Sequence, residues 1–173
     1  TRTLIRSYAL QGKPVNEILS LVNNALATDN RLAMFSTCFL GIMELKTGTV
    51  EYCNAAHSQP FVILPNTDVY VLDTRGGMAL GMLENMTYRV STITMQPGMT
   101  LVLYTDGITD ATNIRREMYG TERIGLTLAS NAALAPQELM MALLSSVDQF
   151  VAGEEQADDI GIVILRYTGS TTP

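Results

Sequence analysis

The feature that most constrains the fold is a central stretch of short apolar runs in which one strand pattern follows another without a helical pattern between them. The runs are rich in β-branched and aromatic residues and are separated by turn signals such as Lys46-Thr47-Gly48. They lie at 34–45, 49–56, 60–64, 69–72, 86–95 and 101–104. This pattern predicts a meander of about six short antiparallel strands, which is typical of a sandwich or a barrel.

Helical patterns lie on both sides of this stretch. Apolar residues recur at helical spacing at 1–10 and 15–26 before it, and at 121–130 and 136–150 after it. The chain then returns to an apolar run at 160–167, which we interpret as a strand buried on both faces. Helices, strands, helices and one returning strand predict an α+β fold in which helices cover a double sheet.

The length and composition favour one well-buried globular domain. The 173 residues are 47% hydrophobic and 16% charged, with no repeat and no linker-like stretch. We assign residues 1–168 to the domain and 169–173 to a disordered tail. No run approaches the roughly 20 apolar residues of a membrane helix, and the N-terminus does not have the layout of a signal peptide, so we expect a cytoplasmic protein without membrane contact.

The formal net charge of −6 argues against nucleic acid as a partner, because a polyanion is repelled by an acidic surface. A cation, or a basic or neutral protein, fits better. The two cysteines, Cys38 and Cys53, lie in apolar stretches and are most simply buried apolar residues. With a single histidine, the chain offers little for soft metals, and hard metals bound by oxygen remain open.

Two acidic clusters stand directly beside strands. YTDGITD, at 104–110, follows the apolar run that ends at residue 104, and QADDIGIVIL, at 156–165, leads into the last strand. The residues concerned are Asp106, Gly107, Asp110, Asp158 and Asp159. Carboxylates at the ends of buried strands are costly to desolvate unless a cation pairs with them. Mg²⁺ and Mn²⁺ accept such ligands, and two ions close together would activate a bridging water and orient a phosphoryl group.

Each candidate also has a structural explanation. AspGly after a strand is a common hairpin turn, although the residues after Gly107 do not resemble a return strand. AspAsp before a strand also occurs at exposed loop ends. His57, the only imidazole, has Asn, Ser, Gln and Pro around it, which favours a structural histidine that bonds loop backbone over a catalytic base. The joint occurrence of two acidic clusters favours the metal hypothesis.

Five segments together resemble the SpoIIE/RsbU-type phosphatases, a PP2C-like family of metal-dependent serine/threonine protein phosphatases. They occur in the order and spacing typical of that family, and the resemblance covers essentially residues 1–168. The segments are NAAHSQPFVIL, GGMALGM, PGMTLVLYTDGITDATN, MYGTERI and QADDIGIVIL. The resemblance implies a PP2C-like β-sandwich, two antiparallel sheets packed face to face and flanked by helices.

The resemblance also implies a pair of Mn²⁺ or Mg²⁺ ions at one edge of the sandwich. By this resemblance, Asp106 and Asp158 hold the ions and Asp110 serves a weaker third metal site. Asp159 is the less favoured ligand of its pair, and Gly107 is a minor candidate.

The chain departs from the family at its beginning. The family opens with an aspartate-rich strand and a glycine motif that supply further ligands, and residues 1–30 contain no match to them. We therefore expect an N-terminally truncated domain that is inactive or nearly so by itself. The exposed strand edge that truncation would leave suggests pairing with a second copy.

The resemblance implies hydrolysis of phosphoserine or phosphothreonine on a regulatory protein, such as an anti-sigma-factor antagonist, by a metal-bridged hydroxide. It places the chain in bacterial signal transduction and stress response, below an upstream sensor or receiver domain. Two alternatives stay open. One is a catalytically inactive pseudophosphatase that binds a phosphoprotein, and the other is a purely structural β-sandwich.

Overall fold

The computed structural model describes residues 1–28, 30–74, 76–156 and 158–169, which divide into two compact units. The first unit comprises Thr1–His57 and Thr74–Met95, and the second comprises Ser58–Asp73 and Gln96–Gly169. Apart from Gly169, the predicted tail lies outside the described residues. In the described part of the chain, no helix is both long and apolar enough to cross a membrane.

The first unit consists of two helices and a three-stranded antiparallel sheet in the order β1-β2-β5. The bounds are α1 (Arg2–Leu10), α2 (Val15–Ala27), β1 (Cys38–Glu44), β2 (Thr49–Ala55) and β5 (Ser91–Thr94). The apolar stripe of α2 packs against β2, and the core around them consists of Val15, Ile18, Leu19, Val22, Cys53, Ala55, Leu80 and Tyr88. Strands β1 and β2 pair antiparallel, as the predicted meander requires, and Gly48 at φ 74° lies in the turn between them.

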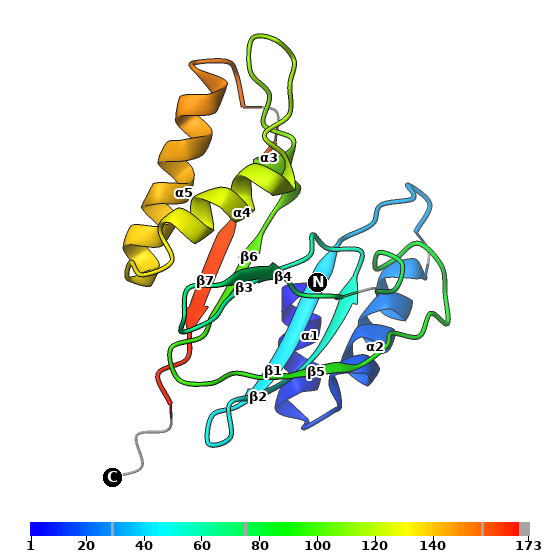
Figure 1. Cartoon of the computed structure of the whole chain (residues 1–173). Coiled ribbons are helices and arrows are strands. Elements are labelled where there is room, and N and C mark those ends of the chain that lie inside the picture. Colours follow the sequence, from blue (N-terminus) through cyan, green and yellow to red (C-terminus); the bar gives the residue numbers. More distant parts are fainter. Residues whose placement is uncertain (29, 75, 157, 170–173) are drawn as a thin grey trace. The chain divides into compact units, whose positions relative to one another are not determined.

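The second unit contains a four-stranded antiparallel sheet in the order β4-β3-β6-β7 and three helices. Its strands are β3 (Phe61–Ile63), β4 (Val69–Val71), β6 (Thr100–Tyr104) and β7 (Ile162–Arg166). Its helices are α3 (Asp106–Thr109), α4 (Gly120–Ser130) and α5 (Pro136–Val151). In Figure 1, α4 and α5 lie over one face of this sheet, where the core includes Phe61, Val102, Ile124, Leu139 and Leu143.

The predicted meander is wrong in its strand pairing. Strand β5 pairs with β2, and β6 pairs with β3, so chain neighbours in the second half of the stretch belong to different sheets. The last strand was also predicted to be buried on both faces, but Val163 is 60% exposed and Leu165 is 40% exposed. Strand β7 lies at the edge of its sheet, and its helix-facing residues alone are covered. The predicted double sheet with flanking helices is confirmed.

Candidate functional site

Strand β6 carries the first acidic cluster to the end of its sheet. Leu101, Val102 and Tyr104 are buried, so the strand is fixed in the core of the second unit. Thr105 is extended, at φ −84° and ψ 159°, and the short helix α3 begins directly after it with Asp106. The hairpin alternative for AspGly is therefore wrong, because a helix and not a return strand follows.

The side chain and backbone of Thr105 join this strand end to the second acidic cluster. The Thr105 amide donates to the carbonyl of Gly161 at 3.0 Å. Its hydroxyl donates to the carbonyl of Asp159 at 2.8 Å and accepts from the amide of Gly161 at 2.8 Å. Three hydrogen bonds thus hold residues 159–161 against the start of α3.

Gly107 allows the two clusters to approach closely. A Cβ atom at this buried position would lie 2.5 Å from the Asp159 carbonyl oxygen and 3.1 Å from that of Asp158. Real Cβ atoms do not approach backbone atoms to 2.5 Å, so only glycine fits here without movement. The structure therefore brings Asp106 and Gly107 together with Asp158 and Asp159, which lie about fifty residues further along the chain.

The carboxylates themselves face water. Asp106, Asp110, Asp158 and Asp159 are all exposed, and none forms an ion pair with a lysine or arginine in the part of the chain that the structure describes. Asp158 Oδ1 accepts a hydrogen bond from the Asp159 amide at 2.7 Å, and Asp110 Oδ1 accepts one from the Thr109 hydroxyl at 3.0 Å. The expected burial of these carboxylates is not observed, so desolvation does not by itself require a cation.

Carboxylate oxygens are the ligands that Mn²⁺ and Mg²⁺ prefer, so the chemistry of these donors fits such ions. The number of ligands that converge on one point, however, is too small. Within the described residues, no three His, Cys, Asp or Glu side chains converge as a metal site requires. The metal-binding roles of Asp106, Asp110, Asp158, Asp159 and Gly107 therefore stay predictions.

The remaining candidates occupy structural positions in the first unit. The His57 amide donates to Asn54 Oδ1 at 2.7 Å, and its carbonyl accepts from Asn54 Nδ2 at 2.9 Å. Its ring Nδ1 lies 3.2 Å from the Thr37 hydroxyl, which agrees with a structural histidine. Burial raises the pKa of the Cys38 thiol, and burial followed by the charge of Glu51 raises that of Cys53 to about 11. Both thiols are free.

The sequence interpretation missed Thr105 and Gly161 as the residues that connect the clusters. A hydroxyl residue at the end of a buried strand, just before an acid, was the available signal. It could not be used because its partners, the backbone groups of residues 159 and 161, are specified only by the pairing of β6 with β7.

A family profile identifies the family of this chain, and a curated relative and solved structures resemble it. The chain matches the sequence profile described as stage II sporulation protein E (SpoIIE) over residues 1–168. Protein IcfG of Synechocystis sp. is 33% identical over 146 residues, which make up 84% of this chain and 23% of IcfG. The chain thus spans about a quarter of the length of this curated relative.

Two solved structures show the same fold. The SiaA-PP2C domain of Pseudomonas aeruginosa has a TM-score of 0.82 and 22% identity, over 96% of this chain and 67% of that one. The phosphatase domain of SpoIIE from Bacillus subtilis, in a manganese-presoaked crystal, has a TM-score of 0.66 and 17% identity, over 99% of this chain and 74% of that one. The predicted PP2C-like fold class is confirmed.

Proposed function

Because the chain belongs to the SpoIIE family, we propose that it acts within a metal-dependent phosphatase that hydrolyses phosphoserine or phosphothreonine on a regulatory protein. The observation that carries the proposal is the close approach of Gly107 to residues 158 and 159, which sets two exposed acidic segments beside each other. Nearby carboxylates without basic partners repel one another, and a divalent cation relieves that repulsion.

In the proposed site, Asp106 and Asp158 hold Mn²⁺ or Mg²⁺, Asp110 serves a weaker third ion, and Asp159 and Gly107 contribute less. The bound ions would supply activation of water and neutralisation of the phosphoryl charge. The contribution of this chain is positional, because Thr105 and Gly107 fix the spacing between the two acidic segments. We take the substrate to be a small regulator such as an anti-sigma-factor antagonist, under the control of an upstream sensor or receiver domain in the parent protein.

The test is Mn²⁺ binding to the chain by isothermal titration calorimetry. With few convergent donors, we expect a dissociation constant on the order of 0.1–1 mM, the weak end of carboxylate sites. Asp106→Asn and Asp158→Asn should each weaken binding about tenfold. Asp68→Asn removes an equal charge from the exposed turn between β3 and β4 and should change nothing. Unchanged affinity in the two site variants, together with higher stability, would instead favour a purely structural sandwich.

Activity gives a separate test. We expect the chain alone to be inactive or nearly so, since fewer than three candidate ligands converge within the described residues. Measurable hydrolysis of p-nitrophenyl phosphate with Mn²⁺ by the chain alone would contradict this expectation.

The same shortage of ligands favours a second candidate, a pseudophosphatase that binds a phosphoprotein without turnover. A parent protein that binds its phosphorylated partner but has no further metal-binding aspartate upstream of this segment would support that candidate.

The proposal extends to self-association. Strand β7 lies at an edge of its sheet, with Val163 and Leu165 exposed, and an open strand edge can pair with a second copy. Light scattering that shows only a monomer across the micromolar range would remove this part of the proposal.

A further inference from the structure

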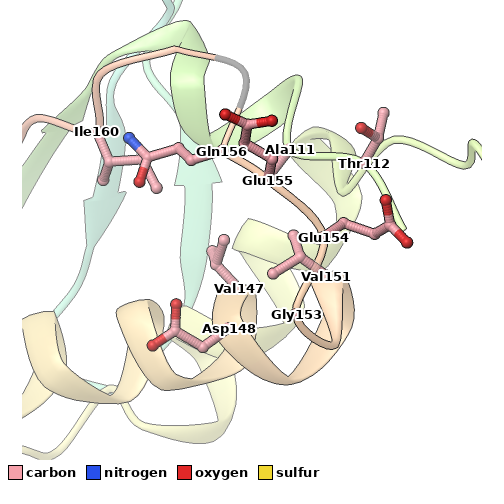
Figure 2. A pocket seen from close by; sticks show the side chains of 10 residues that line it. All are labelled: Ala111, Thr112, Val147, Asp148, Val151, Gly153, Glu154, Glu155, Gln156 and Ile160. Atoms are coloured by element: carbon pink, nitrogen blue, oxygen red, sulfur yellow. The ribbon is translucent and has the colours of Figure 1, made fainter. Parts of the chain in front are cut away.

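A pocket of about 280 Å³ lies in the second unit where α5 ends (Figure 2). Its apolar lining residues are buried or half-buried and form what we call its floor: Val147, Val151, Ile160 and Ala111. Binding sites for whole small molecules usually measure about 300–1,000 Å³. This pocket is therefore of a size to hold one side chain of a partner better than a nucleotide or a similar cofactor.

The rim of the pocket is acidic. The carboxylate residues Asp148, Glu154 and Glu155 line it, and no lining residue is basic. Figure 2 shows Val147 and Val151 between the carboxylate of Asp148 and the side chain of Glu155. An apolar floor between carboxylates matches an occupant that has a hydrocarbon stem and a cationic end.

The end of α5 adds to the negative potential. This 16-residue helix ends at Val151, and the next residue, Ala152, turns the chain away in the left-handed conformation. The C-terminal end of a helix carries a partial negative charge that favours cations within the last turn. The last turn of α5 contains no basic residue, so the helix does not supply that cation itself.

A metal ion is a poorer occupant than an organic cation. A metal requires several oxygen ligands at bonding distance from one point, and no three acidic, His or Cys side chains converge in this way among the described residues. A lysine or arginine places no such demand, because its stem contacts the floor while its charge interacts with separated carboxylates.

The pocket adjoins the two acidic segments. Gln156, which lines it, donates from Nε2 to the carbonyl oxygen of Asp158 at 2.6 Å. Ala111 and Thr112, also lining residues, directly follow Asp110 in the chain. A partner whose phosphorylated residue occupies the proposed catalytic site can therefore reach this pocket with a neighbouring side chain.

We propose that this pocket binds a lysine or arginine side chain of the phosphoprotein substrate and so selects substrates that carry a basic residue near the phosphorylated serine or threonine. The inference rests on the proposed function for the identity of the partner. Its physical basis, an apolar floor and an acidic rim at an uncompensated helix end, is independent of the metal.

The test uses synthetic peptides of alanine and glycine with one central phosphoserine. Each peptide of the series carries a single lysine at a different position, two to six residues on either side, and reference peptides carry alanine or norleucine there. A second series has serine in place of phosphoserine. Binding to the ¹⁵N-labelled chain, in excess Mg²⁺ as the diamagnetic cation of the proposed site, is followed by NMR chemical-shift titration, which measures millimolar affinities.

We expect lysine at one or two positions to tighten binding about three- to fivefold over alanine, as partly exposed ion pairs do, with shifts at the amides of residues 147–156. The gain in affinity from lysine should exceed the gain from norleucine, and it should become smaller in 0.5 M NaCl. Asp148→Asn and Glu155→Gln should each reduce it, whereas Glu122→Gln, an exposed carboxylate on α4, should not.

Equal affinity of lysine and alanine peptides at every position, or a gain that survives in both pocket variants, overturns the inference. Failure of the proposed function has a different signature, since phosphoserine and serine peptides would then bind equally while the lysine gain persists.

Discussion

Replacing Gly107 with alanine tests the contact on which the candidate site depends. The added Cβ would lie 2.5 Å from the carbonyl oxygen and 2.9 Å from the carbonyl carbon of Asp159. Both atoms belong to the backbone, which cannot rotate away as a side chain can. The segment is also fixed by the Thr105 hydrogen bonds, so either these bonds lengthen or α3 moves.

Two opposing effects determine how much Gly107→Ala lowers the free energy of unfolding. Overpacking of a close-packed site costs about 1–3 kcal/mol. Alanine is favoured over glycine in a helix interior by about 1 kcal/mol, but α3 has only four residues and gains less than that. We therefore expect the free energy of unfolding to fall by about 1–2 kcal/mol. For a chain of this size, that corresponds to a decrease of about 2–8 °C in Tm.

Thermal and urea unfolding, followed by circular dichroism, measure this change. Gly125→Ala is the matched control, because Gly125 lies in α4 and its Cβ would meet the Phe61 ring at an ordinary 3.4 Å. That variant should be neutral or more stable. The amide resonances of Asp158 and Asp159 should shift in Gly107→Ala and stay in place in Gly125→Ala. A Gly107→Ala protein as stable as the original, with those resonances unmoved, would refute the close approach.

Three further outcomes follow from the contacts. Thr105→Val should lower the unfolding free energy by about 1–3 kcal/mol in urea titrations, because it removes a hydroxyl bonded to two backbone groups, while Thr92→Val at an exposed position of β5 should not. Asn23→Leu should lower the unfolding free energy by about 2–4 kcal/mol in the same assay, because the fully buried Asn23 amide donates to the Leu83 carbonyl and accepts from the Gly81 amide. An unchanged urea midpoint would contradict this. The pKa of Cys53 is raised from 9.0 to about 11, so the folded state keeps a proton that the unfolded chain loses, and stability should fall as the pH rises from 9 to 11. Its thiol should not react with Ellman's reagent at pH 8 until the chain unfolds.

The local elements could be predicted from the sequence because each has its own pattern. The apolar stripe of α2 and the alternating residues of β1 and β2 are specified within a few residues, and the structure places these elements where predicted. Strand pairing is different, since it depends on contacts between distant segments. Strand β5 lies next to β2 after an excursion through β3 and β4, and no local signal in either strand specifies this partner.

The exposure of β7 and the contacts within the candidate site could not be predicted for a similar reason. The run of β7 is apolar throughout, but an apolar sequence does not reveal whether a neighbour covers each face, and here Val163 and Leu165 are exposed. The family resemblance implied that Asp106 and Asp158 share a metal site, whereas the contacts that join the two acidic segments were not predicted. Thr105 and Gly107 act on backbone atoms of residues 158 to 161, whose positions come from the pairing of β6 with β7.

Different groups position the acidic segments of the site and supply its negative charge. Backbone hydrogen bonds and a glycine contact hold the acidic segments together, whereas the four carboxylates remain in water and make few contacts. Removing a carboxylate from such a position disturbs little packing, and exposed substitutions usually change stability by less than about 0.5 kcal/mol. Asp106→Asn and Asp158→Asn should therefore leave the fold intact, so any loss of metal affinity in these variants reports on the site itself. In contrast, Gly107→Ala keeps every carboxylate and changes their spacing, and a comparable loss of Mn²⁺ affinity in that variant would show that spacing matters as much as charge.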